Sequence, residues 1–246
     1  FVPETGSTNA DLLSRAMAGE DGLDGRWLVA ERQTAGRGRH GREWQSLTGN
    51  FHGSCVVELR ADDPPAHSLA LVAANAVFDA ICDCTQGAVK PVIKWPNDLL
   101  VDGAKIAGIL LERQGDIVVV GIGANLSWAP ELPGRRTTAL KILGHTISAH
   151  GFAHRLAACF AHAVVAWRRD GLPAVLRQWQ ARAHPIGTPL TISEGPCAGL
   201  TGAFDGLEQD GSLRLRFGDG QIKIVHSGEV QLDAQDEGRQ SHAARD

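Results

Sequence analysis

Positive charge gathers in one glycine-rich segment, residues 36–44 (GRGRHGREW), which carries three arginines, three glycines and a tryptophan. Glycine lets a backbone approach a ligand closely. Arginine presents a fixed fork of donors that suits carboxylate and phosphate oxygens, and it keeps its charge near neutral pH. This segment is therefore predicted to wrap an anion.

Two further segments combine charge with turn or strand residues. Residues 94–98 (KWPND) bring a cation, an amide and a carboxylate close together, and Pro96 stiffens the turn. Lys105 and Gly108 follow in residues 105–110 (KIAGIL), where a glycine inside a strand often marks the close approach of a ligand or another backbone. Because side chains alternate along a strand, Lys105 is expected on the face opposite to Gly108. Read alone, residues 94–98 also fit an ordinary loop, and Lys105 also fits a solvated surface charge.

Other chemistries are weakly represented. Gly36, Gly38 and Gly41 match the spacing of a dinucleotide-binding loop, but no apolar helical stripe follows them, as that loop requires. A nucleic-acid-binding arginine–glycine segment is disfavoured by the single short copy and the net charge of −4. His150 and His154 lack a nearby third ligand, so no metal-binding residues are predicted.

The elements that must position these residues alternate between helix and strand patterns. Helices are expected from the Ser7–Asn9 cap to Gly19, over 68–83, and at about 152–169 and 172–183. Strands are expected at 26–31 and 54–59. The Asp-Gly pair at 102–103 joins strands 98–101 and 105–111, and a second turn leads to strand 117–123, which together form an antiparallel meander.

Composition sets the remaining limits. After Pro185, strand-like runs at 188–193, 199–204, 212–217 and 221–226 suggest a small β-barrel of roughly 45 residues, and residues from about Ala234 are expected to be disordered. The five cysteines include no CxxC pair and are expected to be reduced thiols. No leader and no apolar run of membrane-spanning length is evident, so a cytoplasmic protein with no membrane partner is expected.

Taken together, the motifs resemble the biotin–protein ligase family in order and spacing, over about residues 5–232. The resemblance rests on the arginine loop followed by KWPND and KIAGIL, with Ser7-Thr8-Asn9 and Gln33 before them and Gly123-Ala124-Asn125 after them. It implies an α+β fold: a mixed, largely antiparallel sheet flanked by helices, related to class II aminoacyl-tRNA synthetases, with a small C-terminal SH3-like β-barrel. The implied domains are 1–185, which binds biotin and ATP, and 186–233, followed by the tail 234–246.

The resemblance also implies a reaction in two steps. Biotin is activated by ATP, with Mg²⁺ present, to biotinyl-5′-AMP and pyrophosphate. A lysine of a biotin carboxyl carrier protein, as in acetyl-CoA carboxylase or related carboxylases, then takes the biotinyl group and AMP leaves. No protein nucleophile is needed, so the enzyme must hold anions together and neutralise developing charge.

Site residues follow from the resemblance, position by position. Lys105, Arg39 and Asp98 are the expected catalytic residues: Lys105 bridges the biotin carboxylate and the α-phosphate, Arg39 retains the intermediate, and Asp98 either deprotonates the incoming lysine or serves as an anchor. The residues expected to bind biotin or the nucleotide are Ser7, Thr8, Asn9, Gln33, Gly36, Arg37, Gly38, Arg39, Arg42, Trp44, Lys94, Asn97, Lys105, Gly108 and Asn125.

Some expectations concern partners. Family members that repress transcription carry an N-terminal DNA-binding domain, and Ser7-Thr8-Asn9 lies too near the start of this sequence to leave room for one, so no nucleic-acid partner is expected. The sequence does not decide the oligomeric state, and a homodimer is one of the alternatives. A lipoate or octanoate ligase, and a non-catalytic adapter that binds partners through the barrel, stay open as alternatives.

Overall fold

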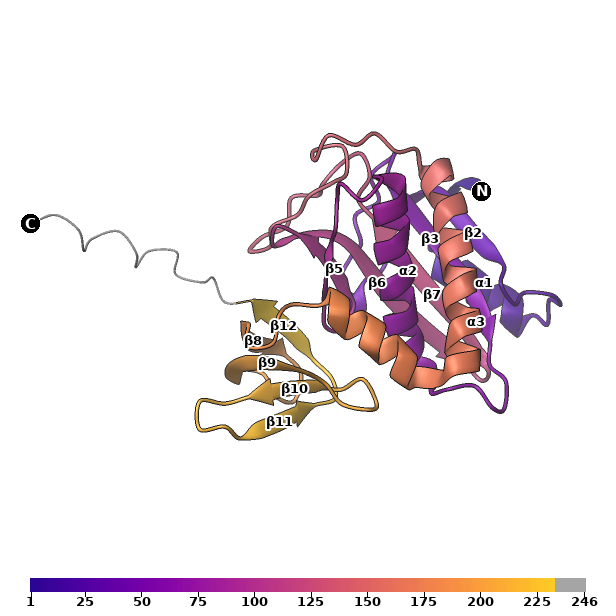
Figure 1. The fold of residues 1–246 in the computed structure, drawn as a ribbon. Coiled ribbons are helices and arrows are strands. Elements are labelled where there is room, and N and C mark those ends of the chain that lie inside the picture. Colours follow the sequence, from indigo (N-terminus) through magenta and orange to yellow (C-terminus); the bar gives the residue numbers. More distant parts are fainter. Residues whose placement is uncertain (233–246) are drawn as a thin grey trace, which may run out of the picture. The chain divides into compact units, whose positions relative to one another are not determined.

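The computed structural model describes residues 1–232 and divides the chain into two compact units, Phe1–Ala183 and a second that begins at His184 (Figure 1). The predicted disordered tail, residues 234–246, lies outside the described residues. All the predicted site residues belong to the first unit.

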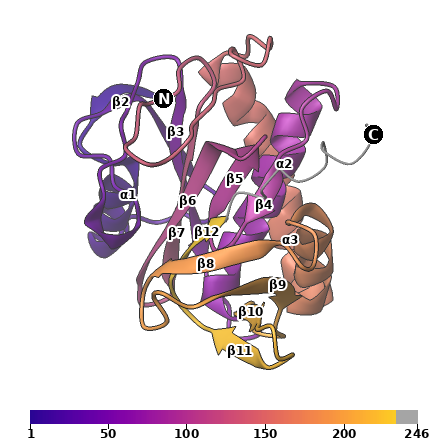
Figure 2. The ribbon, with the colours of Figure 1, turned by 90° about the vertical axis from the view of Figure 1, so that its left-hand side faces the viewer.

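A seven-stranded sheet forms the first unit, in the order β1-β2-β3-β7-β6-β5-β4. Only β1 and β2 pair in parallel, and the remaining neighbours are antiparallel, so the predicted meander is present as β5-β6-β7 (Figure 2). The sequence patterns did not reveal the short strands β1 and β4. The strands are β1 Val2–Thr5, β2 Trp27–Gln33, β3 Phe51–Glu58, β4 Val92–Lys94, β5 Asp98–Val101, β6 Ala104–Gln114 and β7 Ile117–Ala124.

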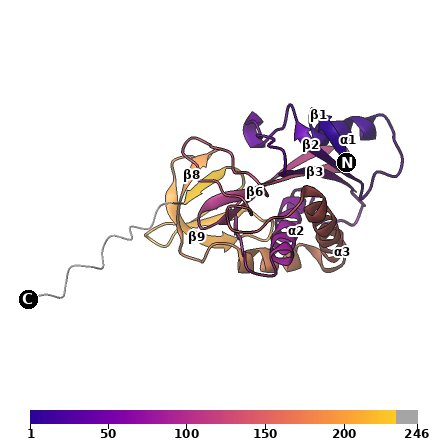
Figure 3. The same ribbon diagram turned by 90° about the horizontal axis from the view of Figure 1, so that it is seen from above.

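Helices cover both faces of this sheet. Seen from above, α1 (Thr8–Met17) lies on one side, and α2 (Leu69–Cys84) and α3 (Ala149–Arg182) lie on the other (Figure 3). Ser7 caps α1 as predicted, since its side chain accepts a hydrogen bond from the Ala10 amide. The two helices predicted near 152–183 are both present, under the single label α3, and they are separated at Gly171, whose φ of +73° and ψ of 179° are not helical.

The helix α2 is the most apolar element of the chain. With the 3₁₀ turn before it, Ala66–Cys84 has the length and composition of a membrane span, which the sequence analysis did not anticipate, and 61% of its most apolar stretch is buried. Its buried side chains face the sheet and α3, as in the core helix of a globular domain.

The second unit contains a five-stranded antiparallel sheet in the order β11-β10-β9-β8-β12. Its strands are β8 Pro189–Glu194, β9 Thr201–Leu207, β10 Leu213–Arg216, β11 Ile222–Val225 and β12 Glu229–Leu232. Alternating residues, including Leu190, Ile192, Leu213 and Leu215, form its core. Four of these strands were predicted, β12 was not, and the sheet is consistent with the expected SH3-like barrel.

Candidate active site

One face of the sheet carries a row of four paired residues, of which the two central ones are glycines. Asp98 on β5 pairs with Gly108 on β6, Gly108 pairs with Gly123 on β7, and Gly123 pairs with His52 on β3. Paired residues on neighbouring strands point to the same face. The two central glycines therefore leave an open strip of backbone between a carboxylate and an imidazole.

The Trp44 side chain lies on that strip. A Cβ atom on Gly123 would come within 2.2 Å of the Trp44 ring, and one on Gly108 within 3.1 Å. Trp44 also anchors the arginine loop, because its backbone amide donates to the Gly36 carbonyl at 2.9 Å. Side chains of this chain itself therefore require glycine at Gly123, whereas a methyl group on Gly108 would make tight contacts with Trp44 and Lys105.

Lys105 lies on the same face as Gly108, and the prediction of opposite faces was wrong. The register between β5 and β6 shifts, because Leu99 pairs with Ala107 while Leu100 pairs with Lys105. This bulge places an extra residue, Ile106, on β6 and reverses the alternation of side chains. The Lys105 ammonium consequently lies over the Trp44 ring, 5.4 Å from its centroid.

Asp98 is the buried carboxylate of the site and faces two cations. Its Oδ1 lies 2.6 Å from Lys105 Nζ, and its Oδ2 lies 3.8 Å from Lys94 Nζ. The Asp98 side chain is only 3% exposed, so these ion pairs are screened weakly by solvent. The cluster of Asp98, Lys94 and Lys105 carries one net positive charge and can bind an anion.

Two buried asparagines brace this cluster through backbone contacts. Asn97 Nδ2 donates to the Ile109 carbonyl at 2.7 Å, and the Ile109 amide donates to the Asn97 carbonyl at 3.0 Å. Asn125 Nδ2 donates to the Thr138 carbonyl at 3.0 Å and approaches the Lys105 carbonyl at 3.5 Å. Asn97 Oδ1 is buried and has no hydrogen-bond partner within residues 1–232.

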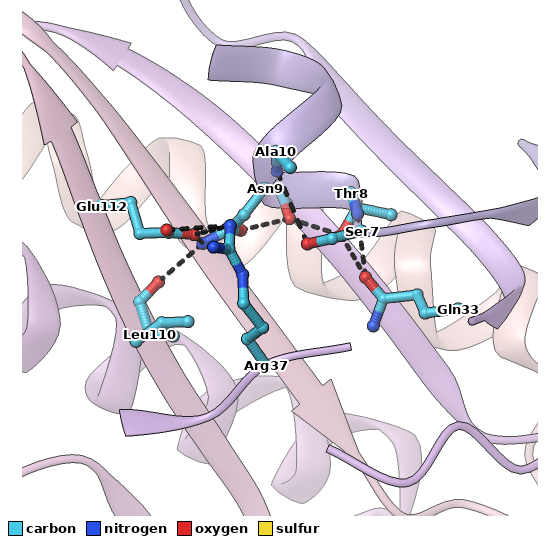
Figure 4. Close-up of polar contacts among 9 residues, drawn as sticks. Ser7, Thr8, Asn9, Ala10, Gln33, Arg37, Leu110 and Glu112 are labelled. Atoms are coloured by element: carbon cyan, nitrogen blue, oxygen red, sulfur yellow. Dashed lines mark hydrogen bonds and ion pairs between the residues drawn. The ribbon is translucent and has the colours of Figure 1, made fainter. Parts of the chain in front are cut away.

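A chain of hydrogen bonds links the start of α1 to the sheet (Figure 4). The Thr8 amide donates to Gln33 Oε1 at 2.8 Å, and the Thr8 hydroxyl lies 2.6 Å from that of Ser54. Ser54 in turn donates to Asn9 Oδ1 at 2.6 Å. Asn9 packs on bare backbone, because a Cβ on Gly121 would come within 2.3 Å of Asn9 Oδ1.

The arginine loop forms a tight hairpin above the sheet. Arg37 and Glu43 form an isolated bridge, the Gly38 amide donates to the Arg42 carbonyl at 2.7 Å, and Arg39 begins a 3₁₀ turn that ends at Gly41. Arg37 pairs with Glu112 on β6 at 3.0 Å. No α-helix follows the loop, in keeping with the rejection of a dinucleotide-binding loop.

His52 holds the Trp44 indole. Trp44 Nε1 donates to His52 Nδ1 at 3.2 Å, so this ring carries its proton at Nε2, which lies 3.4 Å from the Leu47 carbonyl. Burial lowers the pKa of His52, partly offset by the Leu47 carbonyl, and the imidazole is neutral at physiological pH.

The structure thus groups the predicted residues into two neighbouring sets. Lys94, Asp98, Lys105, Gly108 and Trp44 form the charged set, and the polar set consists of Ser7, Thr8, Asn9, Gln33 and Arg37. Sequence reasoning missed His52, Ser54 and Glu112. The available signal was their polarity within or beside otherwise apolar strands.

Comparison with known proteins shows the family of this chain. Residues 6–127 match the model of the biotin/lipoate A/B protein ligase family. A biotin–[acetyl-CoA-carboxylase] ligase of Paracoccus denitrificans is 38% identical over 94% of this chain and 98% of its own length. A protein of the same name from Mycobacterium tuberculosis is 37% identical over 93% of this chain and 86% of its own. The biotin protein ligase of Aquifex aeolicus in complex with biotin and ATP superposes with a TM-score of 0.81 at 26% identity, covering 95% of this chain and 97% of that one. The chain therefore belongs to the biotin–protein ligase family.

Proposed function

We propose that this protein activates biotin with ATP and transfers the biotinyl group to a lysine of a carrier protein. The observation that carries the proposal is the adjacency of a cationic cluster, Asp98 with Lys94 and Lys105, to the neutral hydrogen-bonding side chains of Thr8, Asn9 and Gln33 on the same sheet. A substrate with a charged carboxylate at one end and a neutral polar ring at the other matches both halves.

In the first step, a carboxylate oxygen of biotin attacks the α-phosphorus of ATP and the bond to the leaving pyrophosphate breaks. Both reactants are anions, so the attack needs cations held between them. Lys105 is suited to this role because Asp98 and the bulge of β6 fix its ammonium in place. Arg37, Arg39 and Arg42 bring three further guanidinium groups on the loop.

In the second step, the amine of the acceptor lysine attacks the acyl carbon, and AMP leaves with the electrons of the broken C–O bond. The incoming lysine must lose a proton to act as a nucleophile. We assign Asp98 as the proton acceptor, since it is the buried carboxylate of the charged set. This role requires Asp98 to release a cation as the acceptor lysine enters.

The residues of the site fit Mg²⁺ only as an ion carried by the nucleotide. Mg²⁺ prefers six oxygen ligands and commonly takes one or two carboxylates together with substrate phosphates. Asn97 Oδ1 is a buried oxygen without a partner, and Asp98 is the neighbouring carboxylate, whereas no group of three His, Cys, Asp or Glu side chains within residues 1–232 could hold a metal ion. Asn97 and Asp98 would face the ion, which would supply charge neutralisation at the phosphates.

A biotin carrier domain of a carboxylase is the partner that the names of the relatives support. We further propose that the enzyme works in the cytoplasm, because its five cysteines are unpaired. We also propose that it binds no nucleic acid, because its net charge is −4. Residues 1–185 would supply the chemistry and residues 186–233 a separate domain. A homodimer is a further proposal, which sedimentation at several concentrations would test.

Mass spectrometry of the protein incubated with ATP, Mg²⁺ and biotin, with lipoate in a parallel reaction, tests the proposal. Biotinyl-AMP together with pyrophosphate is the expected product. Lipoyl-AMP alone would leave the fold correct and overturn the substrate. Absence of either adenylate from folded protein would overturn the ligase function and favour a non-catalytic adapter.

A further inference from the structure

Glu112 connects the two halves of the site, although no motif of the sequence includes it. It lies on β6 at the second position beyond Leu110, so it points to the same face as Gly108. The Glu112 side chain is 23% exposed, whereas its partner Arg37 is 47% exposed. The carboxylate is therefore a half-buried charge beneath a more exposed arginine.

Two contacts occupy this carboxylate (Figure 4). Glu112 Oε1 lies 3.0 Å from the Arg37 guanidinium, and Oε2 accepts a hydrogen bond from Asn9 Nδ2 at 2.8 Å. Asn9 belongs to the neutral hydrogen-bonding side chains at the start of α1, and Arg37 belongs to the arginine loop. The Glu112 side chain thus contacts both the start of α1 and the arginine loop.

The contact with Asn9 also fixes the orientation of the Asn9 amide and the direction of its hydrogen bond with Ser54. A carboxylate accepts only, so Asn9 must present Nδ2 to Glu112 and Oδ1 to Ser54. Ser54 then donates to Asn9, and its own oxygen accepts from the Thr8 hydroxyl. Gln33 Oε1 accepts from the Thr8 backbone amide, a contact that does not involve Glu112, and this leaves the Gln33 Nε2 group as a donor near Gly36 of the arginine loop.

We propose that Glu112 is a positioning residue for the biotin site. It holds Arg37, and with it the arginine loop, over the start of α1, and it orients the side chains of Asn9 and Ser54 beside the Gln33 N–H donors, which can bind a neutral carbonyl group. This inference rests on the proposed function for the identity of the ligand. Its structural part, the hold on the loop, is independent of any ligand.

Two single substitutions and their combination separate the two contacts. Glu112→Gln can still accept from Asn9 but turns an amide NH₂ toward Arg37, so it releases the loop. Asn9→Asp places a second carboxylate against Glu112 and removes the donor. The double variant Asn9→Asp/Glu112→Gln exchanges the amide and the carboxylate. The new amide on β6 can then donate to the new carboxylate on α1 and accept from Arg37, and that carboxylate still accepts from Ser54.

The tests are calorimetric titration with biotin, thermal melting, and limited trypsin cleavage within the arginine loop in the absence of ligand. We expect each single variant to weaken biotin binding about tenfold, and the double variant to return within about threefold of wild type. Glu112→Gln should also be cleaved faster in the loop. The control is Asp170→Asn, which breaks an exposed Arg169–Asp170 pair of 2.7 Å on α3, across the sheet from α1 (Figure 3), and should change neither binding nor cleavage.

Wild-type loop cleavage and wild-type affinity in Glu112→Gln would overturn the inference. So would a double variant that binds no better than the weaker single variant, or loss of binding that merely follows a lowered melting temperature. If wild type itself binds no biotin, the proposed function fails, while the cleavage arm still decides whether Glu112 holds the loop.

Discussion

Lys105 is fixed from three directions. Its backbone amide donates to the Arg136 carbonyl at 2.8 Å, and its carbonyl accepts from the Thr138 amide at 2.9 Å. Its ammonium pairs with Asp98 and lies over Trp44. A charge placed in this way needs little reorganisation when negative charge develops on a bound substrate, which is the condition for strong electrostatic catalysis.

Lys105→Ala should lower the rate of adenylate formation by ~10²–10³-fold, because it removes one donor to the developing charge. ATP–pyrophosphate exchange dependent on biotin measures this rate. Lys90→Ala, which removes an exposed lysine outside the site, is the matched control. Exchange at the wild-type rate in folded Lys105→Ala would show that this ammonium is not catalytic.

At the scale of residues, the sequence predicted which side chains lie close together better than it predicted the strand face on which each one lies. Lys94, Asp98, Lys105 and Trp44 were expected together, and the structure brings them together. The shared face of Lys105 and Gly108 was not predictable, because a bulge depends on the pairing of two strands and leaves no local signal. Glu112 was missed since its partner Asn9 lies 103 positions away in the chain.

At the scale of elements, the glycines of β7 decide what can lie on the sheet. Gly121 accommodates Asn9, and Gly123 accommodates Trp44. Each lies on a regular strand, so neither is needed for an unusual backbone conformation. Their role is to leave the surface of the sheet flat at the two points where Asn9 of α1 and Trp44 of the arginine loop pack on the sheet.

Gly123→Ala should preserve the fold and displace Trp44, because the added methyl group would lie 2.2 Å from the ring. We expect biotin affinity to fall about tenfold or more, since the loop that carries Arg37 is anchored by Trp44. Calorimetric titration measures the loss. Gly218→Ala adds a methyl group where no atom lies within 4 Å and should bind as wild type does. Unchanged affinity in Gly123→Ala would separate Trp44 from binding.

Asn50 stabilises the segment that follows β7. Its Oδ1 accepts from the amides of Leu126, Ser127 and Trp128, and its Nδ2 donates to the Trp128 carbonyl at 2.8 Å. Asn50→Ala removes four hydrogen bonds, one to a buried amide and three to part-buried groups, and should lower the free energy of unfolding by about 2–4 kcal/mol. Urea unfolding measures it. Asn50→Asp keeps the acceptor and should cost less; equal losses would contradict this account.

The prediction of helices and strands succeeded where the sequence carries a local turn or cap signal. Asp102-Gly103 and the Ser7 cap fixed a hairpin and a helix start, since each signal is local. The strands β1, β4 and β12, of three or four residues each, were missed, and they form because longer strands offer them an edge.

Across the whole described chain, all five cysteines are free, and burial raises the pKa of several of them. For Cys159, burial first and then nearby aspartates raise the pKa to about 11. Cys55 is shifted further in the same direction. Because thiolates are the reactive form, Cys55 and Cys159 should be resistant to alkylation in the folded protein.

Iodoacetamide at pH 8 should label Cys55 and Cys159 much faster in urea than in buffer, as peptide mass spectrometry would show. The unfolded protein releases these protons near pH 9 and the folded protein only near pH 11 for Cys159, so rising pH in that window should lower the free energy of unfolding. Equal labelling of native and unfolded protein would contradict the burial of these thiols.

The position of Trp44 gives the protein an intrinsic optical signal. Its indole is hydrogen-bonded to His52 and lies beneath the Lys105 ammonium, and its backbone anchors the arginine loop. Trp167 and Trp179, by contrast, are fully buried away from solvent. A ligand that moves the loop or pairs with Lys105 must change the surroundings of the Trp44 fluorophore. Occupancy of the site can therefore be followed by fluorescence emission in the unlabelled wild-type protein, and a Trp44→Phe variant would show which part of the signal belongs to this indole.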